Sequence, residues 1–387
     1  MRIIEAELRE FGGRLGGEAA GLGRWEERGG LLLTLGDAEG GRGQGEASPL
    51  PGYSSDTLSG VRHELSAIEW ARLPSVDLDR APLPQVERVV GAAGLRSPSA
   101  RLAVETALLD LAGGRLGLPL YRLLEAGHGG TSGVVEDADA RAVPVPLAAL
   151  LAGDVLRHAE RLVEEGYGCL KLKVGGAPDA DLALLEALRR EVGAAVALRA
   201  DGNRSLPAAS AEEWLREAAG FNMEFVEEPV AFERLLGLAA THVPIALDES
   251  LHAPAQQAPL APLREAATEA AEEFAADRIS EAADAGRCSF VVLKPMALGG
   301  LGRCMRLAAT ARARGAEVVV SHLFDGPVGL AAAAELALAL RPTPAAGLAP
   351  HPGLGVWPAA VSPAFQGARL ALHDRPGLGL PPLAAAP

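Results

Sequence analysis

The 387-residue chain has few cysteines, and the three that it has, Cys169, Cys288 and Cys304, show neither paired nor metal-type spacing. A disulfide framework or a zinc site is therefore not expected, and a reducing cytoplasm is the compartment that fits best. The first seven residues carry charges where a secretory signal peptide needs its apolar run, so secretion is not expected either.

Clusters of basic residues and long apolar runs are also missing. The chain has 36 Lys and Arg against 50 Asp and Glu, a formal net charge of −14, which argues against nucleic acid or an anionic membrane as a partner. The uncharged stretch at 342–368 is long enough to span a bilayer, but prolines interrupt it repeatedly, so no membrane helix is predicted. With 49% hydrophobic and 22% charged residues, the composition is that of a soluble globular protein with material for two domains.

Short apolar, β-branched runs alternate with longer helix-period segments across the middle of the chain, which is the pattern of βα units around a parallel sheet. Seven runs can be marked, and an eighth near 346–349 is weak; the seven are 143–147, 169–174, 196–201, 224–227, 244–248, 289–294 and 317–321. Between them, Asp154 and Gly166 mark the start and the end of one helix. The pattern predicts an α/β fold, a (β/α) barrel, over residues 141–355. A doubly wound sheet is disfavoured because no G-x-G-x-x-G follows the first strand.

The first 140 residues show a different pattern, with strand candidates at 2–9 and 30–35 and a helix at 99–112. They predict a separate α+β domain. The Pro- and Ala-rich segment 356–387 contains one strand candidate, at 368–373, and we expect this segment to return to the first domain.

Charged residues stand at the ends of successive strands. The second run ends with Lys171 and Lys173, and the later runs end, in order, with Arg199 and Asp201, with Glu227 and Glu228, with Asp248 and Glu249, and with Lys294. In a barrel the C-terminal strand ends form the open face, so one such residue per strand is what convergence on a single point requires.

Three carboxylates at one barrel mouth would repel one another unless a cation neutralised them. An all-oxygen ligand set suits Mg²⁺, with Mn²⁺ as a substitute. A lysine near that ion has its ammonium form disfavoured and can serve as a base near neutral pH. The pattern therefore predicts proton abstraction next to a carboxylate. Each motif taken alone is also typical of solvated surface. The prediction of an active site rests on their order, with one set at the end of each successive strand.

The ordered motifs K-x-K, R-x-D-x-N-R, F-V-E-E-P, A-L-D-E-S and L-K-P-x-x-x-G-G resemble those of the enolase superfamily, in its muconate-lactonizing subgroup. Residues 100–111 and the L-P-L-Y at 118–121 are similar to the capping domain of that subgroup, so the resemblance covers nearly the whole chain. It implies a modified TIM barrel with an N-terminal α+β capping domain.

The resemblance also implies roles for the residues at the strand ends. Asp201, Glu227 and Asp248 would be the ligands of a Mg²⁺ ion. Lys173 would be the general base and Lys294 the lysine on the opposite face of the substrate. Side chains that support these groups would be Lys171, Arg199, Asn203, Glu228 and Glu249.

The segment at 43–54, G-Q-G-E-A-S-P-L-P-G-Y-S, is similar to a loop of the o-succinylbenzoate synthases, which are dehydratases of menaquinone biosynthesis. It implies a small-molecule carboxylate substrate, 2-succinyl-6-hydroxy-2,4-cyclohexadiene-1-carboxylate. By residue type alone the segment is a Gly/Pro turn cluster and could be a structural connection. We expect a mobile lid over the barrel mouth, with Ser48, Pro49 and Tyr53 near the substrate.

Two places depart from the family pattern. Between Asp248 and Lys294 lie 45 residues, with a predicted helical insertion at 263–285, and the seventh strand ends with Ser321 and His322. We expect His322 to contact substrate or to be packed, rather than to act as the base, because Lys294 already takes the opposite face.

Several other activities stay open. They are N-succinylamino acid racemase, which the core motifs do not separate from the dehydratase, muconate cycloisomerase, and dipeptide epimerase, which is disfavoured because residues 347–352 contain no acid. A barrel used only for binding is disfavoured since no ligand or lysine is missing. A homo-oligomer is compatible with the sequence.

Overall fold

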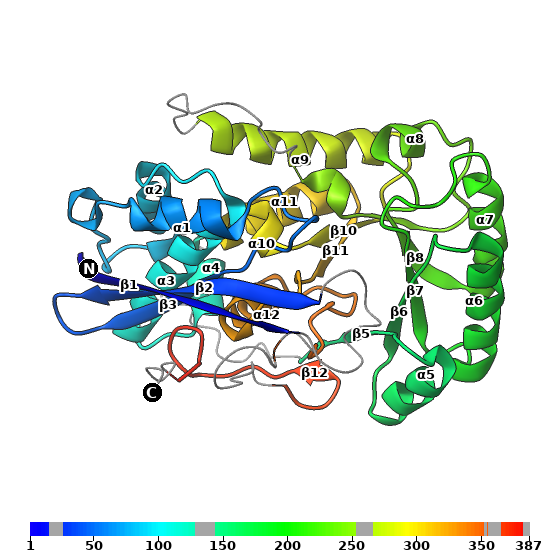
Figure 1. The fold of residues 1–387 in the computed structure, drawn as a ribbon, viewed down its shortest axis with the longest axis horizontal. Helices are drawn as coiled ribbons and strands as arrows, with labels where there is room; N and C mark the ends of the chain where they lie inside the picture. The colour runs from blue at the N-terminus through cyan, green and yellow to red at the C-terminus, as the bar shows by residue number, and fades with distance from the viewer. Residues whose placement is uncertain (15–25, 128–143, 253–265, 352–353, 355–364, 382–387) are drawn as a thin grey trace.

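A computed structural model describes residues 1–14, 26–127, 144–252, 266–351, 354 and 365–381 of the chain. It has two parts, an antiparallel sheet with its helices and a seven-stranded parallel sheet with helices around it (Figure 1). None of the helices in these ranges is long and apolar enough to cross a membrane.

The first part, which we call the cap, is a three-stranded antiparallel sheet in the order β1-β2-β3, with four α-helices packed beside it. The strands predicted at 2–9 and 30–35 and the helix at 99–112 are confirmed, and each is longer in the structure than in the prediction. The elements of the cap are β1 (Ile3–Arg14), β2 (Glu27–Asp37), β3 (Arg42–Ala47), α1 (Leu58–Ser66), η2 (Trp70–Arg72), α2 (Pro82–Ala92), α3 (Pro98–Leu116) and α4 (Leu120–Gly127).

The glycines at the start of the 43–54 segment are strand residues, so the prediction of a loop there was wrong for 43–47. They lie in β3 and face α3 at close range. A Cβ atom added to Gly45 would come within 1.8 Å of the Ala103 carbonyl oxygen, and one added to Gly43 within 2.1 Å of the Ala107 carbonyl oxygen. These glycines are required because the backbone of β3 approaches the helix directly.

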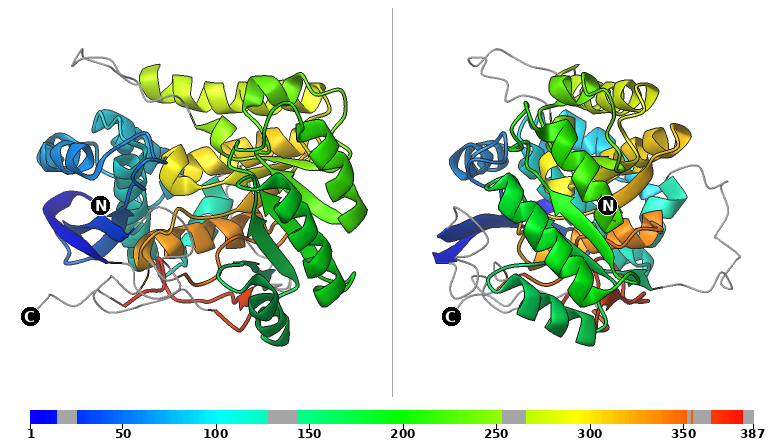
Figure 2. Two further views of the ribbon diagram at one scale, coloured as in Figure 1. Left: turned by 45° about the vertical axis from the view of Figure 1, so that its right-hand side comes forward. Right: turned by 90° about the vertical axis from the view of Figure 1, so that its right-hand side faces the viewer.

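The barrel strands are parallel and neighbour one another in chain order, from β5 to β11. Figure 2 shows the helices between them covering the outside of the sheet. The strands are β5 (Ala148–Leu150), β6 (Cys169–Lys173), β7 (Ala197–Asp201), β8 (Met223–Glu227), β9 (Ile245–Leu247), β10 (Phe290–Leu293) and β11 (Glu317–Val320). The helices are α5 (Val155–Glu164), α6 (Pro178–Val192), α7 (Ala211–Ala218), η3 (Ala219–Phe221), α8 (Phe232–Leu236), η4 (Glu249–Leu251), α9 (Ala266–Asp284), α10 (Pro295–Leu298), α11 (Leu301–Ala313) and α12 (Pro327–Leu340).

Six of the seven predicted strands are confirmed to within about two residues at either end, and so is the helix that Asp154 caps. The first strand was misplaced. Within the predicted run, β4 (Val145–Pro146) pairs with β12 (Arg369–Leu370) instead of the barrel, and the barrel strand β5 follows it. Residue 143 of that run lies outside the described residues.

The weak eighth run, near 346–349, forms no strand in the structure and makes only isolated β-bridges. Ala346 bridges to Leu147, and Gly347 bridges to Ser321 at the end of β11. These contacts join the last strand of the sheet to the first, so the barrel closes through isolated backbone hydrogen bonds.

The insertion after β9 contains α9, which confirms the predicted helix from residue 266 onward; residues 263–265 lie outside the described part. The predicted domain boundaries, near residues 140 and 355, lie outside it as well. Near the C-terminus, the backbone N–H of Leu378 donates to Asp110 of α3 at 2.7 Å, and Leu120 of α4 donates to the Gly377 carbonyl at 2.8 Å.

Buried carboxylates join the cap to the barrel. Glu105 of α3 accepts hydrogen bonds from the backbone N–H groups of Leu301 and Gly302, at the start of α11. In the opposite direction, Glu335 of α12 accepts from the N–H of Tyr121, at 2.7 Å. Each carboxylate satisfies main-chain donors at the first turn of a helix in the other part, where such donors have no partner within their own helix.

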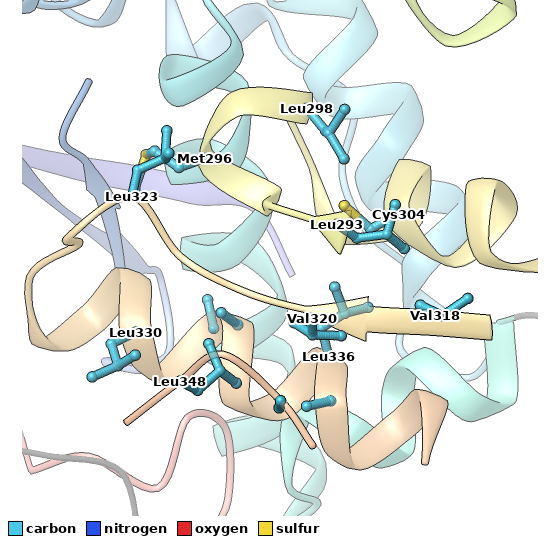
Figure 3. Packing of buried hydrophobic residues seen from close by; sticks show 14 of the residues in the cluster. Leu293, Met296, Leu298, Cys304, Val318, Val320, Leu323, Leu330, Leu336 and Leu348 are labelled. Atoms are coloured by element: carbon cyan, nitrogen blue, oxygen red, sulfur yellow. The ribbon is translucent and has the colours of Figure 1, made fainter. Parts of the chain in front are cut away.

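The hydrophobic core runs from the cap helices to the space between the barrel strands and their outer helices. Figure 3 shows Val318 and Val320 of β11 in this core, together with Leu336 of α12. Inside the barrel a second, smaller cluster contains Phe225, Ala246, Val292 and Val319. Because side chains alternate along a strand, the next inward-facing residues beyond this layer belong to the barrel mouth.

Candidate active site at the barrel mouth

The predicted convergence of charged residues at the strand ends is present. Lys173, Asp201 and Glu227 are direct neighbours across β6, β7 and β8. Asp248 follows β9, and Lys294 follows β10. The strand order therefore places the three carboxylates between the two lysines.

Lys171 lies one layer deeper than Lys173, since the two are separated by one pleat of β6. Its ammonium group donates to Glu227 Oε2 at 2.7 Å and lies 2.8 Å from Asp201 Oδ2. Burial favours a neutral amine, but the Asp201 and Glu227 carboxylates outweigh burial and raise the pKa of Lys171. Lys171 is thus a fixed cation below two of the carboxylates.

Lys294 is the matching cation on the other side. Its Nζ donates to Asp248 Oδ2 and to the hydroxyl oxygen of Tyr53, the latter at 2.8 Å. Burial again opposes the charge, and the neighbouring carboxylates, Asp248 first, raise the pKa of Lys294.

Lys173 has the opposite tendency. Desolvation and the ammonium groups of Lys171 and Lys294 lower its pKa, against the attraction of Asp201. Its Nζ donates to Asn203 Oδ1 at 3.3 Å. A lysine with a lowered pKa can accept a proton more readily than the other two.

The carboxylates respond to the same surroundings. Desolvation and the nearby Asp201 raise the pKa of Glu227 to about 7, and desolvation also raises that of Asp248. For Asp201 the lysines, led by Lys171, outweigh desolvation and the pKa is lowered. Even beside Lys171 and Lys294, burial and mutual repulsion thus make it harder for Glu227 and Asp248 to stay ionised.

Two carboxylate oxygens of the cluster lack a hydrogen-bond partner among the described residues. Glu227 Oε1 and Asp248 Oδ1 are buried and accept no hydrogen bond from the described residues. Among those residues, however, no three acidic, His or Cys side chains have their ligand atoms gathered as a metal ion requires. Lys171 and Lys294 pair with the carboxylates instead. The all-oxygen donor set and the two free oxygens fit a hard divalent cation.

Side chains next to the carboxylates support them. Glu228 points away from the mouth and accepts from the backbone N–H groups of Asp248 and Ser250, each at 2.8 Å. Asn203 donates from Nδ2 to Glu249 Oε1, also at 2.8 Å. Asn203 and Glu228 both have positive φ, 40° and 41°, which non-glycine residues rarely adopt. Such backbone strain is typical of sites where side-chain position matters more than stability.

Arg199 supports the barrel wall, below the mouth. Its guanidinium is buried, pairs with Glu224, donates to the Ala345 carbonyl at 2.8 Å and stacks on the ring of Phe225. Every one of these contacts ties β7 to a neighbouring segment of the wall.

Ser48 and Pro49, which we predicted to lie near the substrate, are held by the protein itself. The buried guanidinium of Arg28 donates to the carbonyl oxygens of both residues and to those of Leu323 and Phe324, which follow β11. This clamp binds the base of the expected lid to the barrel. No motif predicts it, because Arg28 is a lone basic residue in a strand.

Glu46 has a similar structural role. It accepts from the N–H groups of Gly326 at 2.6 Å and Gly329 at 2.8 Å, at the start of α12, and from the Ser48 hydroxyl. Within the 43–54 segment, the residues up to Pro49 therefore serve packing. Tyr53 is the residue that reaches the charged cluster.

His322 packs against its neighbours and also lines the cavity, so both expectations for it, packing and substrate contact, stay open. Its Nδ1 accepts from the Phe324 N–H at 2.9 Å, and its ring stacks on that of His351 with centroids 4.5 Å apart. Burial and the neighbouring His351 lower its pKa well below the usual value, so the ring is neutral. Ser321 donates its hydroxyl to the Gly347 carbonyl at 3.1 Å and holds the closing seam of the barrel. We did not predict His351 at this site from the sequence, because we used residues 347–352 only to show that they lack the acid expected of a dipeptide epimerase.

Most of the charged groups at the strand ends line one cavity of about 1150 Å³ at the mouth of the barrel, whereas Asp248, Glu228 and Arg28 lie behind its lining. Its lining includes Lys173, Asp201, Glu227 and Lys294, together with Tyr53 and His322. The arrangement can hold a carboxylate substrate between two lysines.

Comparison with known proteins identifies the family of this chain. Residues 154–386 match the family model for enolase C-terminal domain-like proteins. N-succinylamino acid racemase from Thermus thermophilus is 30% identical over 305 residues, which cover 78% of this chain and 72% of the racemase. o-Succinylbenzoate synthase from Desulfotalea psychrophila is 28% identical over 342 residues, which cover 81% of this chain and 84% of that protein.

Among solved structures, the dipeptide epimerase from Enterococcus faecalis, complexed with Mg and the dipeptide L-Leu-L-Tyr, superposes with a TM-score of 0.77 at 25% identity. The superposition covers 98% of this chain and 99% of the epimerase. The fold and the site define a (β/α)-barrel enzyme with an N-terminal capping domain. The chain belongs to the enolase superfamily.

Proposed function

We propose that the protein is a metal-dependent lyase that dehydrates 2-succinyl-6-hydroxy-2,4-cyclohexadiene-1-carboxylate to o-succinylbenzoate. The observation that supports this most is the strand order, which puts Lys173 on β6 and Lys294 after β10, with three carboxylate-bearing strands between them. A planar enediolate held over those carboxylates would present one face to each lysine. The o-succinylbenzoate synthase from Desulfotalea psychrophila is a relative of similar length.

Asp201, Glu227 and Asp248 would hold the metal, Mg²⁺ or Mn²⁺. Two of them have a buried oxygen that is free of hydrogen bonds from the described residues. A bound divalent cation would supply positive charge to the substrate carboxylate as negative charge develops on it.

The proton chemistry belongs to the lysines. Lys173 Nζ, as a neutral amine, takes the proton from the carbon next to the carboxylate, and the C–H electron pair enters the carboxylate to give an enediolate. When that pair returns, the C–O bond to the ring hydroxyl breaks, and the hydroxyl leaves as water with the proton that Lys173 carried. The ring becomes aromatic. Lys294 stays an ammonium and stabilises the anion by charge.

Racemisation of N-succinylamino acids is the second candidate. It is favoured by the presence of a lysine on either side of the carboxylates and by the 30% identity to the Thermus thermophilus racemase. In that reaction Lys294 would return a proton to the face opposite Lys173. Dipeptide epimerisation receives less support, since residues 347–352 contain no acid that could hold a substrate amine.

The direct test is to assay the purified protein with both substrates, in Mg²⁺ and after exhaustive chelation. A dehydratase converts the cyclohexadiene to o-succinylbenzoate, and the rate returns when Mg²⁺ or Mn²⁺ is restored. Racemisation with no dehydration would replace the first candidate by the second. Full turnover by the metal-free protein would refute the metal-dependent chemistry in both.

A further inference from the structure

Tyr53 is a cap residue whose hydroxyl lies inside the charged cluster of the barrel. The hydroxyl oxygen accepts a hydrogen bond from Lys294 Nζ at 2.8 Å and donates one to Asp248 Oδ2 at 2.7 Å. The Lys294 ammonium also lies 4.9 Å from the centre of the Tyr53 ring. The edge of the ring packs against His252, with centroids 5.4 Å apart.

The turn that carries Tyr53 is held at its base. The N–H groups of Tyr53 and Ser54 both donate to the Leu50 carbonyl, at 3.0 and 2.9 Å, and the Leu50 N–H donates to the Ser54 hydroxyl at 2.8 Å. Gly52 has φ of 75°, which permits the tight bend. Arg28 joins the carbonyl groups of Ser48 and Pro49, just before this turn, to the segment after β11. The position of Tyr53 is therefore set by the interface between cap and barrel.

The contacts of Lys294 limit where its ammonium can point. An ammonium group has three N–H donors in a tetrahedral arrangement. Two of them are directed to Tyr53 and to Asp248. Their directions fix the third, and Glu227 Oε1, at 3.9 Å, lies beyond hydrogen-bond distance of the same nitrogen.

We propose that Tyr53 is a positioning residue that aims the free N–H of Lys294 at one face of the substrate. The proposal rests on the proposed function, in which Lys294 serves the face opposite Lys173. Tyr53 transfers no proton in this scheme. Its hydroxyl accepts from Lys294 and donates to Asp248 Oδ2, the oxygen to which Lys294 also donates, so that the three groups form a closed hydrogen-bonded triangle. The cap thereby controls one of the two lysines, while the other stays on the far side of the carboxylates.

The experiment compares Tyr53→Phe, which removes only the hydroxyl, with the matched control Tyr121→Phe in α4. In racemisation, where Lys294 transfers a proton, Tyr53→Phe should slow exchange with deuterated water on the Lys294 face about 10- to 100-fold, on the scale measured for misplaced catalytic groups. Exchange on the Lys173 face should change less than about threefold, with KM nearly constant. For dehydration, kcat should fall with little change in KM. Equal loss on both faces, or no loss, would overturn the proposal.

A second readout works without turnover, and so separates failure of this proposal from failure of the proposed function. In protein labelled with ¹⁵N-lysine, the Lys294 ammonium signal can be assigned with Lys294→Arg. Tyr53→Phe should shift this signal and speed its proton exchange with water at least about threefold, because one of its acceptors is lost. Tyr121→Phe should leave it unchanged. An unaltered Lys294 signal in Tyr53→Phe would refute the positioning role whether or not either substrate is turned over. Mn²⁺ affinity, measured by electron paramagnetic resonance, should stay within about threefold of wild type.

Discussion

The backbone N–H of Asp248 donates to Glu228 Oε1 at 2.8 Å, so a glutamate at the end of one strand sets the main chain at the end of the next. Its neighbour Glu227 faces the mouth and accepts from Lys171. Two adjacent glutamates thus serve two purposes, since Glu227 ends β8 and accepts from a lysine of the mouth, whereas Glu228, with a φ of 41°, follows the strand and accepts from the main chain.

Glu227→Gln and Glu228→Gln should separate these purposes. We expect Glu227→Gln to lower turnover by more than about 100-fold and to weaken Mn²⁺ binding, because it removes charge from the mouth. Glu228→Gln keeps an acceptor for the backbone and should cost about 10-fold, at the low end for groups that orient metal ligands. Titration of each variant with Mn²⁺ checks the order. Stronger Mn²⁺ loss in Glu228→Gln would reverse the assignment of the two glutamates.

Glu228→Ala gives a further expectation about stability. The N–H groups of Asp248 and Ser250 would lose their buried acceptor, at a cost of about 1–3 kcal/mol for each. Chemical denaturation should show this loss, and the Gln variant, which retains an acceptor oxygen, should recover most of it.

The two lysines should differ if the protein is a dehydratase and match if it is a racemase. In the first case Lys173→Ala should lower turnover by about 10²- to 10⁴-fold, the usual contribution of an acid–base group, whereas Lys294→Arg keeps a cation and should retain a measurable rate. In the second case each alanine variant should still exchange the α-proton of one enantiomer only. Mass spectrometric detection of deuterium uptake distinguishes the two patterns.

His322→Asn tests whether the stacked histidine takes part in proton transfer. Asparagine can keep the acceptor that the Phe324 N–H uses. Because the ring is neutral and its Nδ1 is occupied, we expect α-proton exchange to stay within about 10-fold of wild type. Loss by the factor expected for Lys173→Ala would make His322 the base after all.

Glu105 should make stability depend on pH. Desolvation and the nearby Glu87 raise its pKa from 4.5 to about 7 in the folded protein. The folded state therefore binds this proton more tightly than the unfolded chain does, so the stabilisation is fully present below pH ~4.5 and is lost as the pH rises to about 7. Between pH 5 and 8, the free energy of unfolding of Glu105→Gln should rise relative to wild type by about 3 kcal/mol. The exposed Glu317→Gln provides the baseline, and parallel pH profiles for all three proteins would contradict the assignment.

The sequence predicted which residues end the barrel strands, but it did not predict the contacts by which the cap packs against them. Asp201, Glu227 and Lys294 were placed correctly because a buried parallel strand leaves an apolar signature that stops where polar residues begin. The glycines of β3 were misread as a turn, since glycine is typical both of turns and of close approach between a strand and a helix, as at Gly45 against Ala103. The Arg28 clamp joins residues almost 300 positions apart and leaves no local pattern.

The buried carboxylates between cap and barrel make the two parts thermodynamically inseparable. If the cap moved away, Glu105, Glu335 and Glu46 would each leave main-chain donors without partners, and buried apolar surface of both parts would meet water. The enzyme should therefore melt as a single cooperative unit, and a gene fragment that encodes only the barrel should give an aggregating polypeptide.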